Sequence, residues 1–312
     1  MDIHSKEAAQ LSGVEVRCLY SMYLAEMQHL HDFPAMTEAA YRALVMSRGE
    51  NMQAVTLEHD GETRAILLYR LGDGYLDIPV FGYYYSDIKY LSMLFDKLLS
   101  DKVHSTTYIN FSGYVHDDAL YRYLTLTQFG VYMEYCVRKP DEIKNISTKY
   151  PVRALGKSEM NERWDEVWGL VKLILNHLKA SPVFYLEDEF TEEGYREFFN
   201  DEGVTVWAAS DENGRLVGLI ESNNEEEHFA LNGHTAYNVG EAVVLPQYRG
   251  TGLAEALLNA CEKDLAAKGI EYTWVNHGTA NPNAMGFWDK YFKPYRYDFE
   301  RKIEFPEQGE VK

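Results

Sequence analysis

The chain has 312 residues, 46% hydrophobic and 25% charged, which is enough for two globular domains. Its formal net charge of -19 disfavours nucleic-acid binding, because a negative surface repels phosphates. The charge suits a small cationic partner, although it can equally serve solubility alone. No stretch approaches the roughly 20 apolar residues of a membrane-spanning helix, and the first seven residues lack the basic and apolar regions that would predict a signal peptide. We therefore expect a cytoplasmic protein without membrane or nucleic-acid partners.

The three cysteines, Cys18, Cys136 and Cys261, are far apart in the sequence. They lack the spacing of a disulfide framework or of a zinc motif, which predicts no metal site and fits a reducing compartment.

Hydrophobic periodicity predicts a first group of helices and strands that ends near residue 138. The polar turn 59–62 separates two apolar runs and indicates a hairpin. The expected helices cover 6–30, 37–47, 87–102 and 117–126, and the expected strands cover 52–58, 63–69, 75–84, 106–111 and 131–138. The proline-flanked polar segment 139–151 then predicts a linker, and we place the domain boundary near residue 148.

The same order of elements repeats after this boundary. The expected helices cover 161–179, 192–200, 252–268 and 283–290, and the expected strands cover 204–209, 216–221, 237–245, 272–276 and 296–303. Because the halves share few residues, the prediction of a duplication rests on element order alone.

A glycine-containing loop between strand 237–245 and helix 252–268 carries the clearest chemical signal. Its sequence is Gln247-Tyr248-Arg249-Gly250-Thr251-Gly252-Leu253. Glycines let backbone N–H groups approach a pyrophosphate closely at a helix N-terminus, and an arginine adds positive charge. A glycine pair alone more often marks a plain turn, but an apolar strand before it and a helix directly after it favour an anion site.

The spacing of Gln247, Gly250 and Gly252 resembles the acetyl-CoA signature of the GNAT superfamily of N-acetyltransferases, Q/R-x-x-G-x-G/A. The likeness covers about residues 150–305. It implies an α+β (α/β) fold of two GNAT-like domains, each a mixed, mostly antiparallel twisted sheet flanked by helices. The expected domains are residues 1–148, a degenerate and non-catalytic copy, and residues 149–312, the acetyl-CoA-binding copy.

The segment 276–292 is similar to the closing motif of the same family, an Asn-Ala pair followed by an aromatic pair. The resemblance implies that acetyl-CoA is the acyl donor and that its pantetheine arm meets backbone groups of the strand. Asn283 would contact it from the last helix or serve as a helix N-cap. The residues implied to hold acetyl-CoA are Val243, Val244, Gln247, Tyr248, Arg249, Gly250, Thr251, Gly252, Leu253 and Asn283.

The first half departs from this motif at the corresponding junction, residues 82–87. That segment has one glycine, no arginine, and Asp87 at the expected helix start. A phosphate would be poorly received there, so we expect this half to support the second or to cover its acceptor cleft.

Transfer to an amine requires a proton acceptor, because an alkylammonium of pKa about 10.4 lies roughly 4.6 kcal/mol from its free base at pH 7. Glu241 precedes Val243 by two residues, so strand alternation places both on one face, and Glu241 is the first candidate for the base. It could equally attract the cationic acceptor or pair structurally. Glu221 on the neighbouring strand is the second candidate.

The family often uses a tyrosine of the aromatic pair as the proton donor for the departing thiolate, but this chain has Phe287-Trp288 there. Indole is not an acid of the required kind. Tyr291, one helical turn further, could replace it, although core packing is a more common role for such a tyrosine. His277 could act as a base, but a lone loop histidine more often has no catalytic role.

The predicted function is transfer of an acetyl group to a primary amine of a small cationic molecule, by direct attack in a ternary complex. The acidic segment 187–193, between the two opening helices of the second half, would favour a cation. Two alternatives stay open: an acetyltransferase for a peptide or protein amine, and an acyl-CoA-binding regulatory protein without turnover. The sequence leaves the acceptor, the acyl-chain preference and the oligomeric state open.

Overall fold

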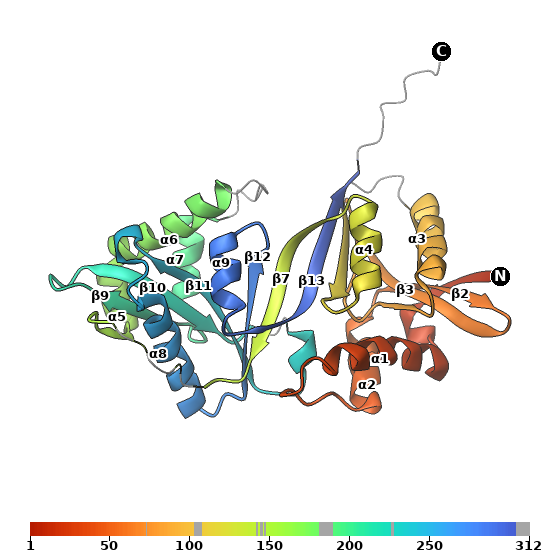
Figure 1. Cartoon of the computed structure of the whole chain (residues 1–312), viewed down its shortest axis with the longest axis horizontal. Coiled ribbons are helices and arrows are strands. Elements are labelled where there is room, and N and C mark those ends of the chain that lie inside the picture. The colour runs from red at the N-terminus through yellow and green to blue at the C-terminus, as the bar shows by residue number, and fades with distance from the viewer. Residues whose placement is uncertain are drawn as a thin grey trace, which may run out of the picture. The chain divides into compact units, whose positions relative to one another are not determined.

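The computed structural model describes residues 1–303, with the exception of 73, 103–107, 142, 144, 145, 147, 181–189, 226 and 227. The chain forms two compact units (Figure 1). Unit 1 comprises Met1–Tyr135 and the described residues from Pro294 onward, and unit 2 comprises Cys136–Lys293. This division differs from the boundary near residue 148 in two ways. It lies earlier in the chain, and it assigns the last strand to unit 1.

Unit 1 carries four α-helices among its described residues, arranged around strands in the order β1-β2-β3-β4-β6-β13, with β5 paired to β3. The helices are α1 Gly13–Met27, α2 Glu38–Arg48, α3 Ile88–Lys102 and α4 Asp118–Leu126. The strands are β1 Asp2–Glu7, β2 Gln53–His59, β3 Glu62–Gly72, β4 Tyr75–Ile78, β5 Tyr83–Tyr85, β6 Tyr108–Tyr114 and β13 Lys293–Lys302. β7, Gly130–Arg138, begins in unit 1 and ends in unit 2.

The N-terminal segment corrects the expected helix 6–30. Residues Asp2–Glu7 form an edge strand that pairs antiparallel with β2, and α1 begins only at Gly13. Ser12 caps this helix, because its side chain accepts a hydrogen bond from the N–H of Glu15. The strand is mostly exposed and has no apolar alternation, so only its pairing partner decides its conformation.

The last strand also differs from the sequence expectation, which made strand 296–303 the end of the second copy. β13 pairs antiparallel with β6, in a register that runs from Arg296 opposite Tyr114 to Lys302 opposite Tyr108. Long-range pairing of this kind leaves no local signal in the sequence, because each strand shows only its own alternation.

Unit 2 has a sheet in the order β12-β11-β10-β9-β8, in which β11 and β12 are parallel and the other pairs antiparallel. The fold class is therefore the predicted one, α+β with mixed, mostly antiparallel sheets and flanking helices. The strands are β8 Val152–Ala154, β9 Thr205–Ser210, β10 Leu216–Asn223, β11 Ala236–Val244 and β12 Tyr272–Gly278. The helices are α5 Lys157–Glu162, α6 Trp164–Lys179, α7 Glu192–Asn200, α8 Leu253–Ala267 and α9 Pro282–Trp288.

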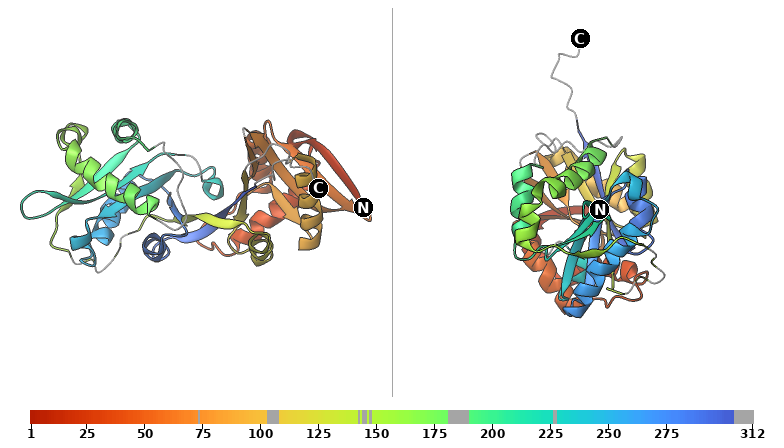
Figure 2. Two further views of the ribbon diagram at one scale, coloured as in Figure 1. Left: turned by 90° about the horizontal axis from the view of Figure 1, so that it is seen from above. Right: turned by 90° about the vertical axis from the view of Figure 1, so that its left-hand side faces the viewer.

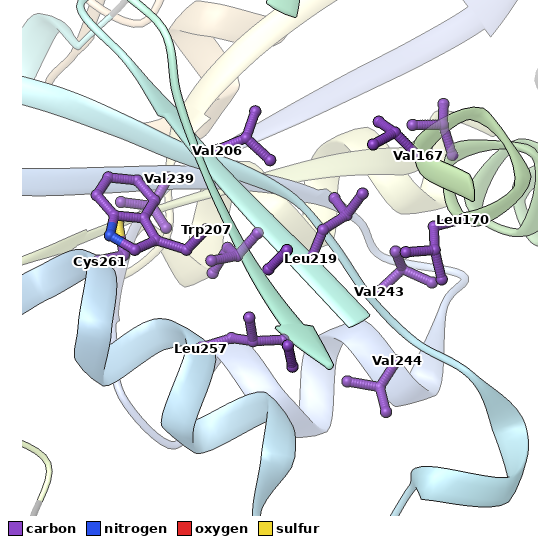
Figure 3. Close-up of a cluster of buried hydrophobic side chains, with 14 of the residues drawn as sticks. Val167, Leu170, Val206, Trp207, Leu219, Val239, Val243, Val244, Leu257 and Cys261 are labelled. Carbon is purple, nitrogen blue, oxygen red and sulfur yellow. The ribbon is translucent and has the colours of Figure 1, made fainter. Parts of the chain in front are cut away.

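Helices cover both faces of this sheet, with α6 on one side and α8 on the other (Figure 2, right). Figure 3 shows how side chains from the two helices and from the strands fill the layers between them. The four-residue spacing predicted for α8 is confirmed, because Leu253, Leu257, Cys261 and Leu265 are each at most 1% exposed. Each buried leucine stabilises the fold by roughly 1.5–3 kcal/mol. The strand-to-helix junction before α8 is thereby held in place.

Among the described residues, no helix combines the length and the apolar character needed to span a bilayer.

Candidate active site

The two parallel strands of unit 2 part soon after they begin. β11 pairs with β10 as far as Val244, but its pairs with β12 run only from Ala236 to Asn238 in the part of the chain that the structure describes. Beyond Asn238, the backbone groups of β11 that face β12 form no further strand pairs with it among the described residues. Such an edge offers backbone N–H and C=O groups to an extended ligand.

A β-bulge marks the point where β11 bends. The pairs Leu219–Val243 and Glu221–Gly240 differ in register, so β11 carries one extra residue between them. Glu241 lies in this bulge with φ of 30°, a conformation that side-chain-bearing residues rarely adopt. A Cβ at Gly240 would lie 2.8 Å from Glu221 Oε1, so a larger residue there would displace the Glu221 carboxyl. Strand alternation predicted that Glu241 and Val243 lie on one face of β11. The bulge between Gly240 and Val243 interrupts that alternation.

The loop after β11 has the backbone that a phosphate site requires. Gly250 and Gly252 both have φ of +72°, in the left-handed region that glycine adopts without strain. Gly252 directly precedes α8 and has no side chain with which to cap its first N–H groups. Arg249 lies beside them, and its Nε donates a hydrogen bond to the carbonyl of Val244 at 3.2 Å.

A cleft of about 440 Å³ lies at this junction, between α6, β11, the loop, the start of α8, and α9. Most of the residues predicted to hold acetyl-CoA line it: Val243, Val244, Tyr248, Arg249, Gly250, Gly252, Leu253 and Asn283. Gln247 and Thr251 do not. The hydroxyl of Thr251 donates to the carbonyl of Tyr248 at 2.6 Å and so braces the loop internally.

The cleft fits an elongated, partly anionic group. Around Gly250 a Cβ would meet nothing within 4 Å, so the space over the loop is open. A pyrophosphate there would meet the positive end of the 15-residue helix α8 and the guanidinium of Arg249. The apolar walls, which include Leu173, Ile174 and Phe287, suit a pantetheine arm.

Two cleft residues escaped the sequence analysis. His177 of α6 and Asn281 both line the cleft, and His177 Nε2 is 2.9 Å from Asn281 Oδ1. Asn281 Oδ1 also accepts from the N–H of Ala284, so Asn281, and not Asn283, is the N-cap of α9. Because Asn281 Oδ1 can only accept hydrogen bonds, its contact with His177 requires a proton on His177 Nε2, which donates it.

Glu241 does not line the cleft, but its neighbour Ala242 does. Glu241 is half-buried, and its Oε1 accepts a hydrogen bond of 2.8 Å from the hydroxyl of Tyr195 in α7. Burial raises the pKa of the Glu241 carboxyl, and the hydrogen bond from Tyr195 opposes that effect. Burial, followed by the nearby charge of Glu241, raises the pKa of Tyr195. Sequence reasoning missed Tyr195 because 46 positions separate the two residues.

Glu221 lies deeper than Glu241, with 1% of its surface exposed. Burial raises its pKa well above the ordinary value, and the charge of Glu241 adds to the rise. The Nδ2 of Asn223 lies 3.4 Å from its Oε2, at the long end of hydrogen bonding. Two carboxyl groups of different burial therefore lie close together at the bulge.

The residues considered for proton donation lie at the far end of α9. Trp288 is 5% exposed and lines the cleft. Tyr291 does not line it: its ring contacts Phe287, and its carbonyl accepts a hydrogen bond of 2.8 Å from Arg138 Nη1. His277 is buried at 5% exposure, and its Nε2 lies 3.9 Å from the sulfur of Cys136.

Part of the acidic segment expected near the acceptor, residues 187–189, lies outside the described residues. Of the remainder, Glu192 accepts a hydrogen bond of 3.0 Å from the indole N–H of Trp164.

Comparison with known proteins agrees with this geometry. Residues 171–292 match the family model of the acetyltransferase (GNAT) family. The whole chain resembles a GCN5-related N-acetyltransferase from Sphaerobacter thermophilus, with a TM-score of 0.59 and 14% identity over 97% of this chain and 96% of that one.

Two further solved structures are similar over most of this chain. A GCN5-related glucosamine N-acetyltransferase region of a fungal multi-domain GH3 beta-N-acetylglucosaminidase has a TM-score of 0.51 and 12% identity over 96% of this chain and 38% of that one. A tandem GNAT protein of the clavulanic acid biosynthesis pathway has a TM-score of 0.48 and 11% identity over 98% of this chain and all of that one. At these identities, the two structures with TM-scores of 0.59 and 0.51 show a likeness of fold alone.

Proposed function

We propose that unit 2 transfers an acetyl group from acetyl-CoA to a primary amine of a small cationic molecule, on the premise that residues 171–292 match the acetyltransferase (GNAT) family. The single observation that carries the proposal is the cleft, in which a splayed strand edge, two left-handed glycines and the N-terminus of α8 meet. When bound, acetyl-CoA supplies an activated thioester. The chain must bind it, orient it, and remove a proton from the acceptor.

The loop and the strand divide the binding between them. The N–H groups at the start of α8, together with Arg249, receive the pyrophosphate. The unused edge of β11, at Val243 and Val244, holds the pantetheine arm and offers an N–H to the thioester carbonyl, where negative charge develops. Asn283 contacts the arm from α9, while Asn281 fixes the start of that helix.

Glu241 is the proposed general base. Its carboxylate takes a proton from the acceptor's ammonium group, directly or through one water, which leaves an amine lone pair for direct attack in a ternary complex. Tyr195 donates its hydroxyl hydrogen to Glu241 and thereby orients the carboxylate and favours its ionised form. Glu221 is more deeply buried, and its raised pKa favours the neutral carboxyl, so the negative charge at the bulge is assigned to Glu241.

The identity of the proton donor for the departing thiolate is a prediction from the sequence alone. Tyr291 was the sequence candidate, and its contacts with Phe287 and Arg138 favour a packing role. Trp288 supports a second candidate function, an acyl-CoA-binding regulatory protein, because it stands in the cleft where the resemblance implies an acidic hydroxyl. A peptide or protein amine is the alternative acceptor.

Thermal unfolding with and without acetyl-CoA tests the binding. At about 100 times the dissociation constant, acetyl-CoA should stabilise the wild type by about 2.7 kcal/mol. Gly250→Asp should abolish this gain by placing a carboxylate at the phosphate position. Gly233→Asp is the matched control, because Gly233 has φ of +88°, has open space around it and lies outside the cleft. If the wild type gains no stability, the loop is only a turn and the proposal fails.

Release of free CoA thiol across a panel of amines then separates the candidate functions. Small diamines and amino sugars should accelerate release more than peptides with free amines do. Preference for peptides would favour the protein acceptor. Binding without acceptor-dependent release would favour the regulatory protein.

A further inference from the structure

Three side chains of metal-binding type meet in unit 2, and none of them lines the acetyl-CoA cleft. Cys136 comes from β7, His277 from β12, and Asp289 directly follows α9. His277 Nε2 lies 3.9 Å from Cys136 Sγ and 3.7 Å from Asp289 Oδ1, and the three ligand atoms lie within 4.8 Å of one another. The same imidazole nitrogen is therefore central to the group.

The spacing suits one small ion held between the three atoms. Zinc binds thiolate sulfur at about 2.3 Å and imidazole nitrogen or carboxylate oxygen at about 2.0–2.1 Å, in tetrahedral geometry. Those lengths place sulfur and nitrogen about 3.5 Å apart and nitrogen and oxygen about 3.3 Å apart. The observed separations exceed these by about 0.4 Å, a gap that small side-chain rotations close on binding.

Burial and chemistry also favour a thiophilic metal. Cys136 is fully buried and His277 is 5% exposed, while the side chain of Asp289 is 44% exposed and gives the ion a route from solvent. A thiolate combined with an imidazole selects Zn²⁺ over the hard cations Mg²⁺ and Ca²⁺, which prefer oxygen ligands.

We propose that Cys136, His277 and Asp289 bind one Zn²⁺ ion. The ion ties the end of β7 to the end of β12 and to the C-terminus of α9. Because α9 forms a wall of the acetyl-CoA cleft, the ion stabilises the unit and acts outside the reaction. The inference differs from the sequence expectation of no metal site, and it does not depend on the proposed acetyl transfer.

Cobalt titration of the metal-free protein tests the site directly. After dialysis against EDTA, Co²⁺ should bind one ion per chain with a thiolate-to-cobalt charge-transfer band and tetrahedral d–d bands. Zn²⁺ should displace the bound Co²⁺. Added to the metal-free protein, Zn²⁺ should release protons as the thiol ionises and raise the Tm with increasing free Zn²⁺. Cys136→Ser should abolish the charge-transfer band and weaken Zn²⁺ binding by about 100-fold or more. Cys18→Ser, which removes a thiol in unit 1, should change neither.

Asp289→Asn covers the case in which Cys136→Ser does not fold, because its half-exposed side chain tolerates a neutral amide. This variant should keep the fold and lose at least about tenfold in Zn²⁺ affinity. Wild-type affinity in Asp289→Asn would overturn the proposal. The proposal would also be overturned if the wild type showed neither a cobalt charge-transfer band nor a Tm that depends on Zn²⁺. Survival of the charge-transfer band in folded Cys136→Ser would overturn it as well.

Discussion

The two units treat the N-terminus of their corresponding helices in opposite ways. In unit 2, Gly252 precedes α8 and leaves its first N–H groups uncapped by a side chain. In unit 1, Asp87 precedes α3, and its carboxylate accepts a hydrogen bond of 2.9 Å from the N–H of Lys89. That hydrogen bond lowers the pKa of Asp87, which keeps a negative charge where a phosphate would have to lie. The residue before the helix therefore differs in charge between the two units, and Asp87 disfavours an anion at the start of α3.

The strands before these helices differ as well. β11 is continuous and leaves β12 after three paired residues, which opens the cleft. Its counterpart in unit 1 is broken into β4 and β5 by a turn in which the N–H of Gly82 donates to the carbonyl of Pro79. β4 pairs with β6 along its whole length, from Tyr75 to Ile78. β5, the strand directly before α3, pairs with β3 and not with β6 in the described part of the chain. The two units therefore differ in the break between β4 and β5 and not in the separation of the strands before the helix.

Glu241→Gln should have the largest effect on the activity that distinguishes unit 2 from unit 1. It removes the proposed base and keeps the size of the side chain. We expect kcat/KM for the amine to fall by about 10²- to 10⁴-fold. Acetyl-CoA binding, measured by thermal shift, should stay unchanged. Tyr291→Phe is the comparison variant and should lower kcat by less than about tenfold, below what a general acid contributes. The reverse ranking of the two variants would assign the chemistry to the far end of α9.

Tyr195→Phe should have a smaller effect, about tenfold on kcat/KM at neutral pH, because a hydrogen bond to a charged group is lost. The same change should raise the pKa of Glu241 further, since the hydrogen bond from Tyr195 lowers it. The acid limb of the pH profile of kcat/KM should therefore move to higher pH. An unmoved limb would mean that Glu241 is not the group that titrates.

Glu221→Gln should change how the stability of the protein depends on pH. Burial raises the pKa of Glu221 in the folded state, so its contribution to stability is fully present below the ordinary carboxyl pKa. That contribution is lost as the pH rises through the raised value. The amide mimics the protonated carboxyl, so the variant should match the wild type in acid and have the higher Tm at neutral pH. Equal Tm values at both ends would show that Glu221 ionises as it does in water.

Asp87→Gly should have the smallest effect, and it sharpens the comparison between the units. The change gives α3 a glycine at the position before its first residue, as α8 has. Loss of the hydrogen bond from Lys89 to Asp87 should lower the Tm slightly. No second acetyl-CoA site should appear, because unit 1 also lacks an arginine at this loop and a continuous strand before the helix. A second binding event in calorimetry would show that the aspartate alone closes the site.

The sequence predicted those features that depend on neighbouring residues. The loop from Gln247 to Leu253 and the buried face of α8 follow from local spacing, and the structure places eight of the ten predicted cofactor residues around one cleft. The N-cap Asn281 was also within reach, because an asparagine before a proline is a helix-start signal.

Long-range contacts could not be predicted in this way. The contact of His177 with Asn281 joins residues 104 positions apart, and that of Cys136 with His277 joins residues 141 apart. The pairing of β13 with β6 and the bulge at Glu241 likewise depend on the partner strand. Periodicity within one segment carries no information on such partners.

The stoichiometry of acetyl-CoA binding, measured by isothermal titration calorimetry, tests the central claim most directly. The account predicts one acetyl-CoA per wild-type chain, the same in Gly233→Asp, and no measurable binding in folded Gly250→Asp. Two acetyl-CoA molecules per chain, or undiminished binding by Gly250→Asp, would contradict the assignment of the cofactor site to the loop of unit 2.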